Sequence, residues 1–313
     1  MAKRLENRES ARNETYNERE AVSNSVVGFM RQQAGRLDEL GRVRSSEMLK
    51  TAANRFSEFR GGMDLPFAMF DSDLMQSFEA FLKTKGLMRN TVGFYMRTLR
   101  SAYNFAVERG LAVDMNPFKH VYTGKDKTIK RALLPKQIKA IMALDLANRP
   151  RFEFARDMFL FSLYARGMAF VDMAYLRKKD LQGGHFTYCR RKTGQTLTVE
   201  WIPEMQRIVD KYKPNPTQYL LPIITNTEKC ERRQYLSQSE NINHALKEIA
   251  ALAGIDVRLT MYWARHTWGT LARDNNIPIS VISEALGHDN EKTTQIYLDS
   301  IPTSVVDTAN RLV

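Results

Sequence analysis

The stretch Leu286-Gly287-His288-Asp289-Asn290-Glu291-Lys292-Thr293-Thr294-Gln295-Ile296-Tyr297 stands near the end of the sequence. A short apolar helix from Pro278 to Leu286 is expected to end at Gly287, because glycine readily adopts the left-handed conformation found at helix C-termini. His288 would then place an imidazole at a helix end. Nine residues further on, Tyr297 falls in a second short helical stretch, where its ring could be buried or its phenol could act as a nucleophile.

A further element lies upstream, in Ala264-Arg265-His266-Thr267-Trp268. Each feature alone has an ordinary explanation, because an isolated tyrosine usually lies in a core or interface and a Gly-His pair is usually just a turn. Together, Arg265, His288 and Tyr297 fall within 33 residues of helical sequence. Basic groups paired with one phenol indicate an anionic substrate.

This combination resembles the C-terminal signature of the tyrosine recombinases, also called phage integrases. The resemblance extends, less strongly, over residues 22–313. It implies a mainly α-helical protein with a small β-hairpin or sheet, built as a two-domain DNA clamp. A helical, SAM-like core-binding domain would be followed by an α+β tyrosine recombinase catalytic domain.

Composition and charge agree with a globular DNA-binding protein. The 313 residues are 43% hydrophobic and 10% aromatic, enough for two domains with cores of their own. A net charge of +12 and a pI near 9.6 imply a polyanionic partner or a self-repelling surface. Cys189 and Cys230 have no zinc-like spacing with histidine, and a disulfide framework is not expected. Without an apolar run of about 18 residues or a signal core, the sequence predicts a cytoplasmic protein, at the bacterial nucleoid if the resemblance holds.

The first half of the chain reads as a tail followed by a helical domain. Residues 1–21 mix both charges without an apolar stripe, which predicts a flexible N-terminal tail. Residues 22–117 form the expected core DNA-binding domain. Its first two helices would be joined around Gly41, a third would end at Gly86, and a fourth would run from Asn90, as N-cap, to Gly110.

Basic residues that could contact DNA phosphates gather in two places. Some lie off the apolar face of the fourth helix, where they form either a solvated face or phosphate contacts. Others lie in residues 118–134, the predicted basic linker, which would cross the DNA between the clamping domains, although a solvated connector would look the same. The candidates are Arg89, Arg97, Arg100, Lys125, Lys127, Lys130 and Arg131.

Residues 135–313 form the expected catalytic domain with its C-terminal helix. Apolar and polar residues alternate from His185 to Trp201 around Thr193-Gly194-Gln195, which predicts a β-hairpin with Lys192 just before its turn. The other predicted elements are helices over residues 137–146, 150–164, 171–180, 203–211, 239–253 and 278–286, together with a helix in 301–313. The helix over 150–164 is the most apolar and should be buried at the centre.

Cutting and rejoining DNA without an energy cofactor requires a nucleophile that conserves the phosphodiester's free energy in a covalent bond. Tyr297 is the expected nucleophile. Arg265 and His288 suit the stabilisation of a negatively charged pentacoordinate phosphorane. The resemblance implies that Lys192 protonates the departing 5′ oxygen as general acid. Side chains supply the cations in this scheme, and no metal or other cofactor is expected.

One departure from the family pattern concerns the first catalytic arginine, which would follow Gly167-Met168. Ala169 stands at that position. On a continuous helix Arg166 would lie one turn back on nearly the same face and could substitute for the missing arginine. Alternatively, Arg166 is a helix-end or ion-pair residue, and another basic side chain supplies the charge.

A second departure lies three residues before Arg265, where Tyr262 replaces the family's usual histidine. A phenol can donate a hydrogen bond to phosphate but is a poor proton shuttle near neutral pH, so Tyr262 is a candidate phosphate contact only. His266 is expected to pack behind the site. Asp172 matches an acidic position of the family and is expected to orient its neighbours.

Both departures resemble a subgroup linked to conjugative transposons and phase-variation invertases, which implies integration and excision or inversion of DNA. Residues 1–21 are too short for an arm-site domain, which slightly favours inversion. The expected reaction passes through a 3′-phosphotyrosyl intermediate and a Holliday junction in a homotetramer on paired double-stranded sites, with an accessory DNA-bending protein as a further candidate partner. The alternatives are a type IB topoisomerase-like relaxing enzyme and a catalytically inactive DNA-binding regulator.

Overall fold

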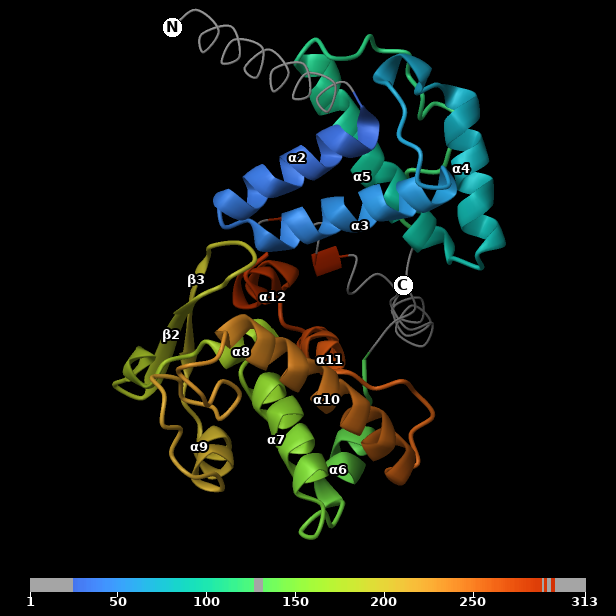
Figure 1. The fold of residues 1–313 in the computed structure, drawn as a ribbon. Coiled ribbons are helices and arrows are strands. Elements are labelled where there is room, and N and C mark those ends of the chain that lie inside the picture. The colour runs from blue at the N-terminus through green and yellow to red at the C-terminus, as the bar shows by residue number, and fades with distance from the viewer. Residues whose placement is uncertain (1–24, 127–131, 289, 292–293, 296–313) are drawn as a thin grey trace, which may run out of the picture. The chain divides into compact units, whose positions relative to one another are not determined.

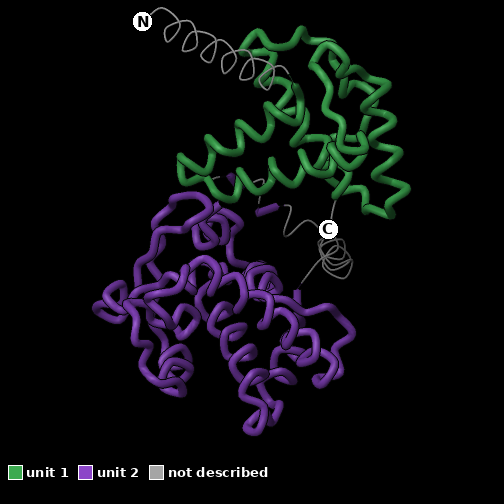
Figure 2. The backbone as a smooth tube through the Cα atoms, in the orientation of Figure 1, with its two compact units in different colours: residues 1–128 green, residues 129–313 purple. Residues whose placement is uncertain are grey.

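The computed structural model describes residues 25–126, 132–288, 290–291 and 294–295. The chain divides into two compact units, residues 1–128 and 129–313 (Figure 2). Most described residues are helical, and one small antiparallel sheet lies in the second unit (Figure 1). No helix within these ranges combines the length and apolar character needed to cross a membrane.

The first unit is a helical domain around an aromatic core. The predicted junction at Gly41 and the helix ends at Gly86 and Gly110 are confirmed, each glycine having a φ near +70°. Phe56 and Phe78 meet edge to face in the core, with their ring centroids 5.2 Å apart. The elements are α2 (Val26–Glu39), α3 (Val43–Phe59), η1 (Phe67–Met69), α4 (Ser72–Thr84) and α5 (Arg89–Glu108).

The predicted N-cap of α5 was wrong. The helix begins at Arg89 with Met88 as its N-cap. The side chain of Asn90 instead binds the backbone of Asp126, donating from Nδ2 to the carbonyl at 3.2 Å and accepting the amide at 2.7 Å. A tertiary contact with the end of this unit therefore uses the amide group that a cap would have needed.

The second unit surrounds one buried helix, α7, as predicted. Helices α10 and α11 pack along α7, and α9 lies beside it (Figure 1). All side chains from Ala155 to Leu163 are buried, which explains why this helix has no exposed polar stripe there. The helices are α6 (Pro135–Ala143), α7 (Pro150–Tyr164), α8 (Phe170–Ala174), η2 (Lys178–Asp180), α9 (Pro203–Asp210), α10 (Glu231–Leu252), α11 (Met261–Asp274) and α12 (Ile279–Leu286).

The sheet contains the predicted hairpin, β2 (His185–Cys189) and β3 (Thr196–Glu200), and the two-residue strand β1 (Leu181–Gln182), which the sequence analysis missed. The strands are antiparallel in the order β1-β2-β3. Phe186 is opposite Val199 and Tyr188 is opposite Leu197, and all four side chains are buried. One face of the hairpin therefore packs on the core of the unit.

The boundaries of two further helices differ from the prediction, and tertiary contacts explain the first. The helix expected to end near Asp180 stops at Ala174. The backbone beyond it pairs with residues 218–220, since Leu220 N donates to Leu176 O at 2.7 Å and Lys178 N donates to the carbonyl of residue 218 at 3.0 Å. Helix α10 begins at Glu231, eight residues before the predicted start at Ser239.

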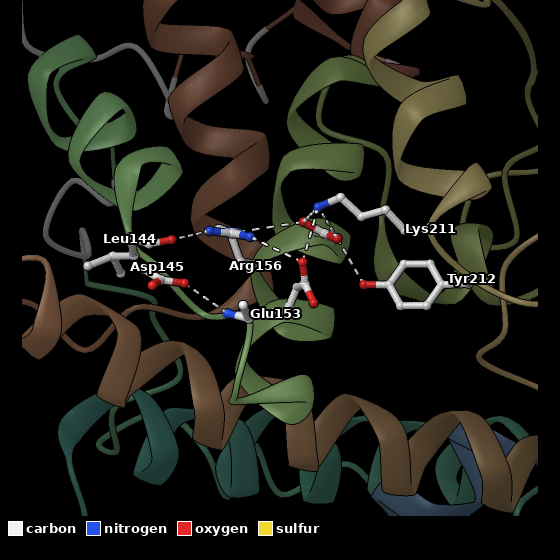
Figure 3. A network of polar contacts seen from close by, with 8 residues as sticks. Leu144, Asp145, Glu153, Arg156, Lys211 and Tyr212 are labelled. Carbon is white, nitrogen blue, oxygen red and sulfur yellow. Dashed lines mark hydrogen bonds and ion pairs between the residues drawn. The ribbon is translucent and has the colours of Figure 1, made fainter.

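A buried carboxylate ties α7 to the end of α9. Asp157 is 1% exposed and accepts hydrogen bonds from Lys211 Nζ and Tyr212 Oη, each at 2.9 Å. Arg156 Nε lies 3.6 Å from the same carboxylate, and Arg156 Nη1 donates to Leu144 O at 2.6 Å (Figure 3). Burial, followed by the charge and hydrogen bond of Asp157, raises the pKa of Tyr212. The network joins α7, the chain after α6 and the chain after α9.

We expect Asp157→Ala to lower the free energy of unfolding by about 3 kcal/mol, because it removes a buried charge partner of Arg156 and the hydrogen-bond acceptor of the Tyr212 phenol. Chemical denaturation of the full chain measures this loss. The exposed ion pair between Glu204 and Arg207 provides the control, and Glu204→Ala should cost no more than about 0.5 kcal/mol. Equal effects of the two substitutions would contradict the structural role of Asp157.

Candidate active site

Arg265, in α11, is a buried charge that joins distant segments of the second unit. It is 4% exposed. Its Nη1 donates to Gly167 O at 3.1 Å, and its Nη2 donates to Leu286 O and faces His288 Nε2 at 3.2 Å. The guanidinium therefore connects the loop after α7 with the end of α12.

The approach of Arg265 depends on a glycine. Gly167 has a φ of +69°, and a Cβ built on it would lie 2.5 Å from Arg265 Cα. Any side chain at this position would both strain the backbone and displace α11. Gly167 thus lets its own carbonyl reach the guanidinium.

His288 lies where the sequence predicted, directly after the end of α12. Gly287 is in the left-handed conformation, with φ +62° and ψ +49°, which confirms the predicted helix end. His288 Nδ1 lies 2.8 Å from Thr294 Oγ1. Because a guanidinium only donates, Nε2 must accept from Arg265, and Nδ1 therefore carries the proton and donates to Thr294. This arrangement requires a neutral imidazole.

The electrostatic environment also favours neutral His288. Burial, with the positive charges of Arg265, Arg190 and Lys192 acting in the same direction, lowers its pKa to about 4. Protonation would add another positive charge to a group that is already desolvated. Arg265, Arg190 and Lys192 are therefore all close enough to His288 to influence its charge state.

Lys192 projects from the loop between β2 and β3 and is exposed. The loop is closed by Arg190, whose amide donates to Gln195 O and whose carbonyl accepts from Gly194 N, both at 2.8 Å. The Arg190 side chain is 6% exposed and donates to Gly287 O, next to His288. The hairpin therefore brings Lys192 to the same end of α12.

Sequence analysis assigned no role to Arg190, although one signal pointed to it. The predicted alternation places Phe186, Tyr188 and Arg190 on one face of the hairpin, and the first two are apolar or aromatic core residues. An arginine that continues such a series must be buried or lie at the edge of the core. Its burial beside His288 was visible only in the folded chain.

Asp172 lies at the base of the hairpin loop. Its side chain is 4% exposed, and Oδ1 accepts the amide of Arg191 at 2.9 Å. Burial raises the pKa of Asp172, against the opposing influence of the Arg191 amide and of Arg190 and Arg265. The carboxylate is placed to orient the loop that carries Lys192, the kind of role the sequence analysis expected of it.

The continuous helix assumed for Arg166 was wrong. Helix α7 ends at Tyr164, and Arg166 itself has a φ of +55°. Its Nη1 donates to Thr198 O on β3 at 3.3 Å. Tyr262 is 45% exposed on α11 and packs edge to face on His266, with ring centroids 4.7 Å apart. His266 is near enough to His288 for its charge to contribute to the low pKa.

The DNA-contact candidates on α5 bind residues 122–126, near the end of the first unit. Arg97 donates to the carbonyls of Thr123 and Gly124, and Arg100 donates to Thr123 Oγ1 at 3.2 Å. Arg89 stacks on the Tyr122 ring at 4.1 Å and lies 3.7 Å from Asp126. Lys125 is exposed. The candidates that lie outside the described residues are Lys127, Lys130, Arg131 and the expected nucleophile Tyr297.

No group of three or more His, Cys, Asp or Glu in the described part of the chain is arranged to hold a metal ion. Both cysteines are free and exposed.

Two family models together match nearly the whole chain. Residues 6–127 match the phage integrase SAM-like domain, and residues 131–303 match the phage integrase family. Among curated relatives, the tyrosine recombinase XerA of Thermococcus kodakarensis is 24% identical, over 70% of this chain and 74% of its own length. XerC of Bacillus licheniformis is 26% identical, over 68% and 71%.

Solved structures share the fold at lower sequence identity. The Tn1549 transposon integrase in complex with a circular intermediate DNA has a TM-score of 0.68 and 15% identity, covering 93% of this chain and 100% of that one. A lambda integrase dimer bound to a core site has a TM-score of 0.62 and 15% identity, covering 91% and 80%. A lambda integrase tetramer bound to a Holliday junction has a TM-score of 0.60 and 14% identity, covering 80% and 71%.

We expect His288 in the DNA-free protein to stay neutral until the pH falls toward about 4, well below the value near 6.5 of an unperturbed histidine. An NMR titration of its ring signals measures this. Because the unfolded chain binds the proton at higher pH, acidification from about pH 6.5 to 4 should also destabilise the fold through this residue. Arg265→Gln removes a neighbouring charge and should raise the pKa, whereas wild-type titration near 6.5 would contradict the geometry.

Proposed function

The chain belongs to the phage integrase family and is a site-specific tyrosine recombinase, and we propose that Tyr297 cleaves DNA with Arg265, His288 and Lys192 as its catalytic partners. The observation that carries the residue assignment is the buried contact between Arg265 and His288, with Lys192 in electrostatic reach. A guanidinium held rigidly in a desolvated site suits a phosphodiester that becomes more negative as it reacts.

The arrival of DNA would change the charge state of the site. A phosphate bound beside Arg265 places negative charge next to His288, which raises the pKa of the imidazole toward a useful range. His288 Nε2 then accepts the phenol proton of Tyr297 as the oxygen attacks. The resulting imidazolium and the guanidinium together stabilise the phosphorane.

A bond forms between the Tyr297 oxygen and the phosphorus, and the bond from phosphorus to the 5′ oxygen breaks. Lys192 donates a proton to the departing 5′ oxygen, and the DNA 3′ end remains as a phosphotyrosyl ester. A 5′ hydroxyl from the partner strand reverses these transfers, so that rejoining needs no energy cofactor.

The substrate in this proposal is double-stranded DNA. The basic residues of α5 and of residues 118–134 would contact phosphates, which sets position without reading sequence. Strand exchange in pairs requires four copies on two sites, passing through a Holliday junction, as in the lambda integrase tetramer. An accessory DNA-bending protein would assist site pairing, and the reaction would take place on cytoplasmic, nucleoid-associated DNA.

Integration and excision or inversion of a DNA segment are both compatible with this chemistry. The curated relatives are named as tyrosine recombinases, which does not favour a type IB topoisomerase-like enzyme or an inactive DNA-binding regulator. Arg166 and Tyr262 remain candidates for phosphate contact. Asp172 would act by holding the Lys192 loop.

Tyr297→Phe should abolish covalent capture of DNA, because it removes the attacking oxygen and leaves the ring. The substrate is a nicked duplex whose sequence is recovered by selecting a random library on the full-length protein. Incubation in EDTA and denaturing electrophoresis detect the covalent band. If the variant formed as much covalent complex as wild type, another residue would be the nucleophile.

Thr294→Val should slow formation of the covalent complex roughly tenfold, the effect of one lost hydrogen bond of about 1–1.5 kcal/mol to the catalytic imidazole. Valine keeps the volume of the buried threonine but cannot accept from His288 Nδ1. Thr294→Ser is the matched control, since it keeps the hydroxyl and should retain most of the rate. Loss of activity in both variants would indicate a packing role alone.

A further inference from the structure

The phosphorane develops charge on two non-bridging oxygens, and Arg265 is the one guanidinium assigned to them above. The position of the family's first arginine holds Ala169. We propose that Arg190 is a second such group, a catalytic residue that contacts the scissile phosphate. The proposal rests on the proposed function and names a residue that the sequence resemblance did not provide.

Arg190 is a buried charge, and one of its donor groups has no partner among the described residues. Its side chain is 6% exposed. One nitrogen donates to Gly287 O, while the buried Nε has no hydrogen-bond partner among the described residues. Arg190 also forms no ion pair with any residue that the structure describes. Burying an unpaired guanidinium is costly, so the site is suited to an anion from outside the chain.

Arg190 and Arg265 both contact the chain at the end of α12. Arg265 donates to Leu286 O and faces His288. Arg190 donates to the carbonyl of Gly287, the residue between these two. Both charges lower the pKa of His288. Two guanidiniums therefore flank one turn, the arrangement needed to hold a phosphate from two directions.

The charge balance of the site also favours an anionic ligand. Burial raises the pKa of Asp172, and the charges of Arg190 and Arg265 oppose this rise. Its carboxylate accepts a hydrogen bond from the amide of Arg191. One carboxylate with a raised pKa cannot neutralise two buried guanidiniums and the nearby Lys192. Among the described residues the site therefore carries excess positive charge, which a phosphodiester would balance.

Arg166 is the competing candidate, and its geometry is less favourable. It stands beyond the end of α7, is only half-buried, and donates to Thr198 O in the middle of β3. Arg190 instead lies two residues before Lys192, on the loop that carries this proposed general acid. A single movement of the hairpin toward DNA would bring both residues to the phosphate.

The test compares full-length wild type, Arg190→Gln and, for the competing candidate, Arg166→Gln on two forms of the selected nicked duplex. One form has the normal scissile phosphate. The other has a methylphosphonate there, which replaces one charged oxygen with a neutral methyl group. Glutamine can still donate to Gly287 O, and thermal melting and DNA binding confirm that each variant folds. Arg190→Lys, which keeps the charge, serves if the glutamine variant does not fold.

We expect Arg190→Gln to slow covalent capture on the normal phosphate roughly 10²–10³-fold, and to match wild type closely on the methylphosphonate, where that charge is absent. Arg190→Lys should lose less on the phosphate and nothing on the methylphosphonate. Arg166→Gln should lose far less than Arg190→Gln on the normal phosphate, because Arg166 donates to Thr198 O on β3.

Two results would overturn the proposal while leaving Tyr297 as the nucleophile. Equal slowing of Arg190→Gln on both duplexes would mean that Arg190 only positions the hairpin. A wild-type rate for Arg190→Gln, with a charge-dependent loss in Arg166→Gln, would assign the role to Arg166. Absence of a covalent band from wild type on a duplex that it binds would reject the proposed function itself, and this proposal with it.

Discussion

The catalytic half of the molecule depends on the hydrogen bonds of one buried guanidinium, that of Arg265. A desolvated positive charge must be surrounded by acceptors, and here they are the carbonyls of Gly167 and Leu286 and the ring of His288. This requirement fixes where α7 must have ended and where α12 must end. It also explains why Gly167 has no room for a side chain, since its backbone lies against that of Arg265.

The same charges set the chemistry of the site. With Arg265, Arg190 and Lys192 close together, His288 is held neutral and Asp172 is buried at the edge of the group. A site of this kind is electrostatically incomplete without an anion. Tertiary packing around α7 and α12 offsets the cost of assembling like charges, and in the proposed reaction a phosphodiester bound between the donors would lower this cost.

In the first unit, polar side chains of α5 likewise make tertiary contacts. Arg89, Arg97 and Arg100 were expected to be a solvated face or phosphate contacts, yet they hold residues 122–126 against α5. Asn90 joins this contact instead of capping its helix. An engagement of this kind makes the start of the linker part of the helical domain, and contact with DNA phosphates would have to compete with it.

The sequence by itself determined the elements whose causes are local. Continuous apolar character fixed α7, strict alternation fixed the β2-β3 hairpin, and the left-handed preference of glycine fixed the end of α12 before His288. Motif spacing indicated Arg265 and His288 together. Only the tertiary structure decided the early end of α8, the partner of Asn90 and the burial of Arg190. Those outcomes depend on backbone and side-chain partners 36 to 97 residues away, which no local pattern in the chain records.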